Sequence, residues 1–308
     1  MKRLISTAFF LSIVAFMSAQ QAIPLYDGKI PNSKKYVTEE KWLPRANGDT
    51  IVSNISVPTL TVFLPQDNGH SKAAVIICPG GGYWRASIVK EGFAIAREFN
   101  KNGIAAFVLK YRVPEDSAME NKSVVPLQDA QRAIQLVRTN ADKWKLDTGK
   151  IGIMGFSAGG HVASTASTHF SRSMIDNPAN TNLRPDFSIL IYPVISFEDS
   201  VGHMGSRERL IGKNPGRQMI ESFSNELQVN KKSPPAFLVH ASDDKAVPVA
   251  NSIRYYEALL KNDIPAELHI YKGGGHGFGM INPTTDDRWM ESCIHWMKSM
   301  NLTGELSQ

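Results

Sequence analysis

Cysteine is scarce in this sequence, and so are the spacings that mark metal sites. The only cysteines are Cys78 and Cys293, and no group of Cys and His residues has metal-ligand spacing. We therefore expect no metal and no other cofactor. One disulfide is an alternative for the two cysteines, but a chain of this length can be stabilised by its hydrophobic core. Two buried thiols are the favoured interpretation.

Charge of one sign is not concentrated anywhere along the chain. The 34 Lys and Arg and the 29 Asp and Glu residues are interspersed, and the formal net charge is +5. A nucleic-acid-binding surface needs a basic patch or stripe, so the sequence predicts no nucleic-acid partner. Neither charge nor composition indicates an oligomeric state, which stays open.

Long apolar runs are absent as well, apart from one at the N-terminus. Lys2 and Arg3 precede an apolar stretch over residues 4–16, and small residues follow it. This pattern is typical of a cleavable signal peptide, here residues 1–20, because a membrane-spanning helix needs about 20 apolar residues. The alternative is an N-terminal membrane anchor. We expect a protein exported to the periplasm or the medium, without membrane contact once the signal is removed.

Beyond a polar, extended lead-in (residues 21–56), short apolar runs alternate with helical patterns. Several runs are continuously aliphatic or β-branched, which is typical of strands buried on both faces of a parallel sheet. The apolar runs lie at residues 59–64, 73–78, 105–111, 151–156, 187–194, 237–240 and 267–271, and the helical patterns at residues 90–102, 127–144, 158–169, 249–262 and 286–300. Their alternation predicts one doubly wound α/β domain over residues 57–302, with a mostly parallel sheet and helices on both faces.

One stretch, roughly residues 169–235, interrupts the alternation. It contains a single evident strand, and the remainder is polar with scattered Pro and Gly. Segments inserted above the strand ends often shape a binding site. An irregular surface loop is an equally supported alternative.

The pattern G-x-S-x-G occurs at residues 155–159, directly between an apolar run and a helical pattern. This is the strand–turn–helix context of a nucleophile elbow, with Ser157 as the nucleophile. A turn sharp enough to lift the Ser157 hydroxyl off the strand end leaves no room for side chains at Gly155 and Gly159. The helix that follows directs its free N–H groups and positive dipole end at the serine.

A triple glycine (residues 80–82) follows the second apolar run. Glycines allow backbone N–H groups to approach a ligand closely, and the N–H groups of Gly81, Gly82 and Ala158 are the predicted oxyanion hole. A flexible turn is one alternative. A phosphate-binding loop is another, but it would need Gly-Lys-Ser/Thr at this point.

Two aromatic residues, Tyr83 and Trp84, come directly after the glycines. They are candidate substrate-binding residues, because their rings offer surfaces for stacking on a sugar or an aromatic acyl group. Packing against the rim of the site is an equally supported alternative.

A candidate base and its carboxylate partner follow near the C-terminus. Asp243 and Asp244 come directly after an apolar run, at the edge where open α/β sheets form their sites. The spacing D-x-x-V-P favours Asp244, and Asp243 is then a candidate turn or cap residue. His276 lies in a glycine-rich loop after the last apolar run, whereas His161, for example, is expected to pack on the helix that follows Ser157.

The three candidates occur in the chain order Ser157, Asp244, His276, which is the order of the α/β-hydrolase fold. A serine hydroxyl needs a base that is neutral near pH 7, and histidine supplies one. We expect His276 to take the proton from Ser157 and Asp244 to orient the imidazole.

Several longer stretches resemble known proteins. Over roughly residues 57–300 the chain resembles the α/β-hydrolase superfamily, although Pro79 stands where the hormone-sensitive-lipase-like branch usually has His. Four stretches resemble secreted bacterial carbohydrate esterases of the acetyl xylan, feruloyl and xylanase-associated kinds: PGGGY, VLKYRVP, PLQDAQRAIQLVR and IGIMGFSAGGHVAST. The resemblance implies hydrolysis of O-acetyl or feruloyl esters on a plant polysaccharide such as xylan.

Other functions fit the same residues less closely. A general carboxylesterase for small esters would use the same triad. A serine peptidase of the prolyl-oligopeptidase kind shares the triad order, but the short lead-in leaves no room for the propeller domain that such enzymes normally carry. A non-catalytic binding module with this fold is disfavoured by the intact Ser, Asp, His and glycine loop.

Overall fold

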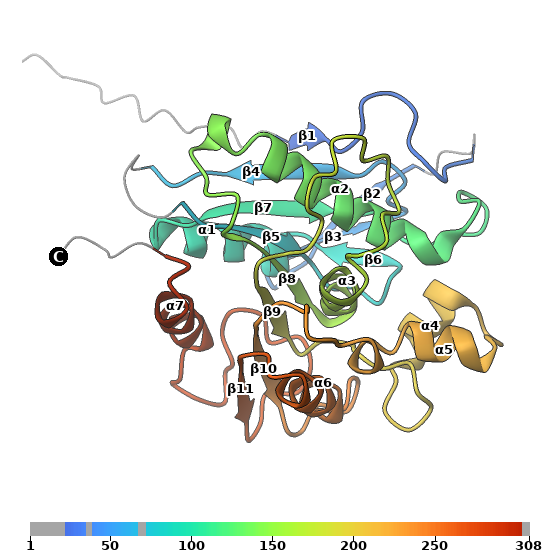
Figure 1. The fold of residues 1–308 in the computed structure, drawn as a ribbon. Helices are drawn as coiled ribbons and strands as arrows, with labels where there is room; N and C mark the ends of the chain where they lie inside the picture. Colours follow the sequence, from blue (N-terminus) through green and yellow to red (C-terminus); the bar gives the residue numbers. More distant parts are fainter. Residues whose placement is uncertain (1–21, 35–38, 67–71, 304–308) are drawn as a thin grey trace, which may run out of the picture.

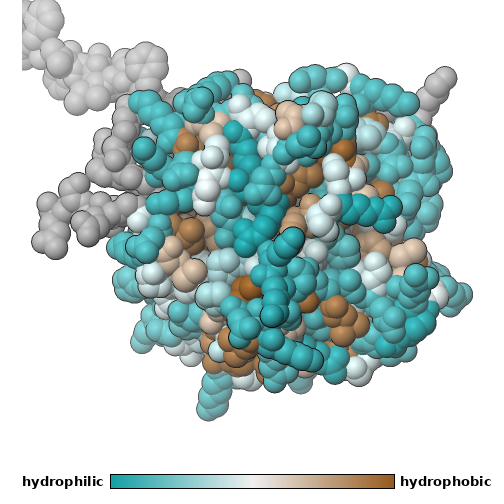
Figure 2. Space-filling view, viewed as in Figure 1, coloured by the Kyte–Doolittle hydropathy of each residue, from teal (hydrophilic) through white to brown (hydrophobic). Residues whose placement is uncertain are grey.

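The computed structural model describes residues 22–34, 39–66 and 72–303 of the chain. The predicted signal peptide (residues 1–20) lies outside these residues and stays a prediction. No helix among the described residues is long and apolar enough to cross a membrane. The face of the molecule in Figure 2 is largely hydrophilic, and its hydrophobic residues form only small groups.

An eight-stranded sheet forms the centre of the molecule (Figure 1). Its strands, in spatial order, are β1 (Ala22–Pro24), β4 (Thr59–Phe63), β7 (Ala105–Lys110), β5 (Ala74–Cys78), β8 (Ile151–Phe156), β9 (Ser188–Ile191), β10 (Ala236–Ala241) and β11 (Ala266–Tyr271). All neighbours from β7 to β11 are parallel, whereas β1 and β4 pair antiparallel at one edge. The predicted mostly parallel α/β sheet is confirmed.

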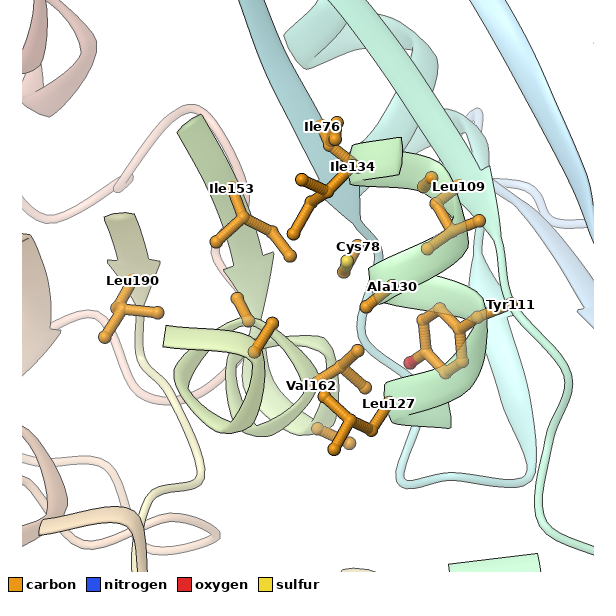
Figure 3. Packing of buried hydrophobic residues seen from close by; sticks show 14 of the residues in the cluster. Ile76, Cys78, Leu109, Tyr111, Leu127, Ala130, Ile134, Ile153, Val162 and Leu190 are labelled. Atoms are coloured by element: carbon orange, nitrogen blue, oxygen red, sulfur yellow. The ribbon is translucent and has the colours of Figure 1, made fainter. Parts of the chain in front are cut away.

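Helices cover both faces of this sheet. They are α1 (Ala94–Lys101), α2 (Val125–Thr139), α3 (Ser157–Thr168), α6 (Ala250–Lys261) and α7 (Trp289–Ser299). Successive strand residues point to opposite faces, so Ile76 and Cys78 belong to a core under α2, α3 and α6, while Ile77 belongs to a core under α1 and α7. In Figure 3, Ile134 of α2 lies against Ile76 of the sheet.

The two cores account for the stability of the fold without a cross-link. Each fully buried aliphatic side chain contributes about 1.5–3 kcal/mol relative to an exposed one. Cys78 lies in the first core and Cys293 in the second, and both are buried free thiols. The prediction of two buried thiols is confirmed.

A second, smaller sheet has three antiparallel strands. It consists of β2 (Lys41–Pro44), β3 (Thr50–Ser53) and β6 (Arg85–Ser87). Residues 21–56 were expected only as an extended lead-in, but β2 and β3 belong to this sheet and β1 to the main one. All three strands are short, β1 and β2 are largely exposed, and β3 buries only Val52, so they lack the apolar runs on which strand prediction depends. The domain boundary at residue 57 stays a prediction.

The 169–235 segment contains two helices besides β9, namely α4 (Met204–Ile211) and α5 (Arg217–Ser222). They lie at the right-hand side of the molecule in Figure 1. In α4 only Ser206 and Leu210 are buried, so the sequence contains too few apolar residues to mark a helical face. Shorter helical turns are a π-helix, η1 (Val89–Phe93), and the 3-10 turns η2 (Lys122–Val124), η3 (Asp142–Trp144) and η4 (Asn225–Leu227).

Candidate active site

Ser157 is the first residue of α3 and follows β8 without a gap. Its φ is +50°, a left-handed conformation that costs a non-glycine residue roughly 1–3 kcal/mol. A Cβ at Gly155 would lie 2.0 Å from the Gly159 carbonyl oxygen, and one at Gly159 would lie 2.1 Å from the Cys78 carbonyl oxygen. Only glycine therefore fits on either side of the turn, as the nucleophile-elbow pattern predicts.

His276 lies between the two other predicted residues. Its Nε2 is 2.8 Å from Ser157 Oγ, and its Nδ1 is 2.6 Å from Asp244 Oδ2. The three side chains come from the carboxyl ends of β8, β10 and β11, the edge at which open α/β sheets bind ligands. The structure thus brings together three residues that are 119 and 32 positions apart in the chain.

Asp244 is held by hydrogen bonds on both of its oxygens. Oδ1 accepts the N–H groups of Ala246 and Val247, each at 2.9 Å, and Oδ2 faces both His276 and His240 Nε2. Burial opposes ionisation of this carboxyl, but the hydrogen bonds from His240, His276 and Val247 outweigh it and hold its pKa below the ordinary value. Asp244 is therefore ionised at neutral pH.

The neighbouring aspartate has a different place. Asp243 Oδ1 accepts the N–H of Gly275 at 2.8 Å, so Asp243 fastens the loop that carries His276. His240 was not predicted as part of the site. Its Nε2 faces the Asp244 carboxylate and the Val247 carbonyl, which can only accept, so Nε2 carries the proton and Nδ1 accepts from Ser252 Oγ at 2.8 Å.

The glycine loop lies beside Ser157. A Cβ at Gly80 would be 3.0 Å from Ser157 Cβ, and Gly81 and Gly82 have φ values of +144° and +64°. No hydrogen bond between described residues has the N–H of Gly81 or Gly82 as its donor. The N–H of Ala158 belongs to the first turn of α3, where backbone donors have no partner within the helix. These three N–H groups are available as the predicted oxyanion donors.

A buried carboxylate, which the sequence did not single out, joins the glycine loop to the histidine loop. Glu91 lies in the π-helix η1, a kind of turn often found at functional sites. Its Oε2 accepts the Gly80 N–H at 2.8 Å, and its Oε1 accepts the Tyr192 hydroxyl at 2.8 Å. That hydroxyl accepts the Gly279 N–H at 2.9 Å, and the Tyr192 ring packs edge-on against His276. Burial raises the pKa of Glu91.

The prediction that the Tyr83 ring contacts substrate is wrong. Tyr83 is only 1% exposed, and its hydroxyl lies 2.7 Å from Nδ1 of the fully buried His161. Its ring also packs edge-on against Tyr111, so it has no free surface on which a ligand could stack. His161 packs on the elbow helix as expected, and burial lowers its pKa to about 4.

Trp84 has the opposite environment. Its side chain is 46% exposed, and it borders a cleft of about 250 Å³ that is also lined by Gly82, His203, Gly205 and Arg209. Of the two aromatic candidates, only Trp84 can meet a substrate.

A model of the BD-FAE family matches residues 60–259, which is more than half of the chain. The chain belongs to the BD-FAE family. Residues 216–306 also match the dienelactone hydrolase family. The predicted membership of the α/β-hydrolase superfamily is confirmed.

Two relatives of this BD-FAE chain have names that refer to xylan. The acetylxylan esterase of Xylanibacter ruminicola is 35% identical over 246 residues, 78% of this chain and 48% of the relative. Endo-1,4-beta-xylanase B of Butyrivibrio fibrisolvens is 35% identical over 235 residues, 76% of this chain and 36% of the relative. The chain thus spans half or less of the length of these relatives.

A solved structure extends the similarity over almost the whole fold. The acetyl ester-xyloside bifunctional hydrolase of Caldicellulosiruptor lactoaceticus superposes with a TM-score of 0.77 and 35% sequence identity, covering 92% of this chain and 97% of that one. The expected resemblance to bacterial carbohydrate esterases is confirmed at the level of the family.

Proposed function

We propose that this BD-FAE protein is a secreted serine esterase that removes acyl groups, chiefly acetyl, from xylan or a related plant polysaccharide. The strongest support is the relay of Asp244, His276 and Ser157, with distances of 2.6 Å and 2.8 Å, beside the Gly81 and Gly82 N–H groups, which have no acceptor among the described residues. A nucleophile, an oriented base and oxyanion donors at one edge are what acyl transfer needs.

The reaction proceeds through an acyl-enzyme. Ser157 Oγ attacks the ester carbonyl carbon while His276 Nε2 takes its proton, and the N–H groups of Gly81, Gly82 and Ala158 hold the oxyanion. His276 then gives the proton to the leaving sugar oxygen, which departs as an alcohol and leaves acetyl-Ser157. Water attacks this ester with His276 as base, acetate leaves, and Ser157 regains its proton.

Xylan is proposed because of the relatives' names. One is called an acetylxylan esterase, another an endo-1,4-beta-xylanase, and a third an acetyl ester-xyloside hydrolase. Feruloyl esters remain a second acyl class for the same site. Export rests on the signal-like pattern over residues 1–20.

Acetate release from acetylated xylan tests the proposal. The wild type should release acetate and be labelled by a fluorophosphonate, whereas Ser157→Ala should lose turnover by at least about 10⁴-fold with an unchanged Tm and no labelling. Ordinary acetate release by Ser157→Ala would disprove the mechanism. If the wild type turns over 4-nitrophenyl acetate but releases no acetate from xylan, the general carboxylesterase alternative is correct.

A further inference from the structure

A polar cleft leads away from the proposed oxyanion loop. The hollow of about 250 Å³ at Gly82 and Trp84 shares Gly205 and Arg209 with a second hollow of about 520 Å³. The second hollow is lined in addition by Pro114, Glu115, Asp116, Lys122, Glu208, Gly212 and Lys213. Since the two hollows have walls in common, they are neighbouring parts of one depression between α4 and the loop that precedes η2.

Trp84 lies at the end of this cleft that borders the glycine loop. A Cβ on Gly82 would be 3.3 Å from Trp84 Cδ1, so the indole lies directly against the loop of the proposed oxyanion hole. The Arg85 guanidinium lies 4.6 Å from the Trp84 ring centroid and supports one face of the ring. Trp84 is therefore a pre-positioned and half-exposed apolar surface.

His203 contributes a hydrogen-bond donor of fixed direction. It precedes α4, and its Nδ1 accepts the N–H of Ser206 at 3.1 Å and lies 2.8 Å from Ser206 Oγ. Because a backbone N–H can only donate, Nδ1 has to be the acceptor, and the neutral ring carries its proton on Nε2. No hydrogen bond between described residues uses Nε2.

The environment keeps His203 neutral. Burial lowers the pKa of His203, a protonated His276 lowers it further, and the Asp244 carboxylate opposes this effect.

The charges on the cleft walls balance. The lining of the second hollow includes the basic residues Lys122, Arg209 and Lys213 and the acidic residues Glu115, Asp116 and Glu208, and Lys122 is paired with Asp116 at 2.5 Å. Such a surface offers many hydrogen-bond donors and acceptors but has no net charge. It therefore does not attract a polyanion, and it is too polar for an aliphatic acyl chain. It matches a neutral chain that is rich in hydroxyl groups.

We propose that this cleft binds the sugar chain that carries the ester, with a pyranose ring on Trp84 and its hydroxyl groups on His203 Nε2 and Arg209. The inference rests on the proposed esterase function and extends it to the alcohol side of the substrate. The acetyl group occupies the space at Ser157, and the cleft selects esters on an oligosaccharide over esters of small alcohols.

Paired substrates test the cleft. In Trp84→Ala, kcat/KM for an acetylated xylo-oligosaccharide should fall at least about tenfold more than kcat/KM for 4-nitrophenyl acetate. The reason is that the sugar ring of the oligosaccharide covers the indole, whereas the small ester does not reach it. Trp42→Ala is the matched control, because Trp42 is 49% exposed but does not line the cleft. It should leave both values unchanged. Equal losses on both substrates in Trp84→Ala, or no loss on either, would overturn the proposal.

A second variant isolates the donor on His203. In His203→Asn the shorter side chain still has an oxygen to accept the Ser206 N–H, so α4 keeps its cap, but nothing replaces Nε2–H in the cleft. The oligosaccharide should lose about 2–10-fold in kcat/KM relative to 4-nitrophenyl acetate, with an unchanged Tm. An unaltered substrate ratio would show that His203 only caps α4.

Direct binding separates this inference from the esterase proposal. Xylohexaose without acetyl groups should bind to the Ser157→Ala protein in a calorimetric titration, and Trp84→Ala in that background should abolish or weaken the binding at least tenfold. Absence of xylohexaose binding overturns the sugar cleft even if acetate is released. Absence of acetate release by the wild type overturns the esterase proposal even if xylohexaose binds.

Discussion

At the scale of single residues, the two oxygens of Asp244 have different partners, and this difference decides where the proton of His276 lies. Oδ1 is occupied by two backbone N–H groups, which can only donate. Oδ2 accepts from His276 Nδ1 at 2.6 Å and, over a longer distance of 3.2 Å, from His240 Nε2. With the proton on Nδ1, the other nitrogen is a free base that faces Ser157.

Asp244→Asn should therefore move the proton of the His276 imidazole from Nδ1 to Nε2. The two backbone donors will keep the amide oxygen of Asn at the place of Oδ1, so the NH₂ group will face His276 and donate to Nδ1. The imidazole proton then moves to Nε2, which can no longer accept from Ser157. We expect kcat for 4-nitrophenyl acetate to fall by about 10⁴-fold, with a folded protein by circular dichroism.

Asp243→Asn is the matched control. Its oxygen still accepts the Gly275 N–H, so we expect a loss of less than about tenfold, the order of one neutral hydrogen bond. A larger loss in Asp243→Asn than in Asp244→Asn would reverse the assignment of the two aspartates.

At the scale of elements, Glu91 holds two loops in register. The π-helix η1 places one Glu91 carboxylate oxygen against the glycine loop and the other against the Tyr192 hydroxyl. Tyr192 in turn packs on His276, and its hydroxyl accepts the Gly279 N–H of the loop that carries His276. The oxyanion donors and the base thus share one buried connection. A shift of either loop would change the distance between them.

Glu91→Gln should loosen this connection. An amide has only one acceptor oxygen, so either the Gly80 N–H or the Tyr192 hydroxyl loses its partner, at a cost of about 1–3 kcal/mol. We expect kcat to fall about tenfold or more with little change in KM. Tyr192→Phe should act through the same contact, and the double variant should lose less than the sum of the two single losses.

Glu98→Gln on α1 removes a carboxylate of the same kind from a surface pair with Lys101 and should be neutral, because such pairs contribute about 0–1 kcal/mol. Additive effects of Glu91→Gln and Tyr192→Phe would argue against a shared connection.

The elements that the sequence predicts are those with their own periodic signal. The runs at β5, β7 and β8 are buried along their whole length, so apolar residues and glycine fill them, except for Lys110 at the end of β7. Strand β2 is exposed at every position and ends in Pro44, and it exists only because β3 pairs with it. Pairing between segments leaves no mark on the sequence of either one.

The candidate site likewise contains residues that a local motif marks and residues that no motif marks. Ser157 and His276 carry local marks, a G-x-S-x-G turn and a glycine-rich loop, and chain order connects them. Glu91 and Tyr192 are 101 residues apart, and neither stands in a motif. For Tyr83 the sequence left substrate contact and packing equally supported, because its partner His161 is 78 residues away.

At the scale of the whole molecule, His161 connects three regions that have to stay together. It lies on the elbow helix α3, its Nδ1 meets the Tyr83 hydroxyl after the glycine loop, and its Nε2 meets the Phe223 carbonyl in the 169–235 segment at 2.8 Å. A carbonyl can only accept, so Nε2 carries the proton and Nδ1 accepts from Tyr83. A second proton, on Nδ1, would face the hydroxyl at a fully buried position.

The fold should therefore lose stability in mildly acidic solution. Burial lowers the pKa of His161 from 6.5 to about 4, and that of the adjacent His169 is lowered as well, also by burial. Between these values the unfolded chain binds a proton that the folded chain does not. The stabilisation is complete above pH 6.5 and decreases as the pH falls towards 4, by on the order of 3 kcal/mol for His161.

Urea unfolding of the wild type and of His161→Gln at pH 7.5 and pH 4.5 measures this effect. Glutamine supplies one acceptor and one donor for the same two partners, but it does not titrate. The wild type should lose more unfolding free energy between the two pH values than the variant does. Equal losses of unfolding free energy in the two proteins would mean that another group takes up the proton. The contact between α3, the glycine loop and the 169–235 segment would then not depend on a neutral His161.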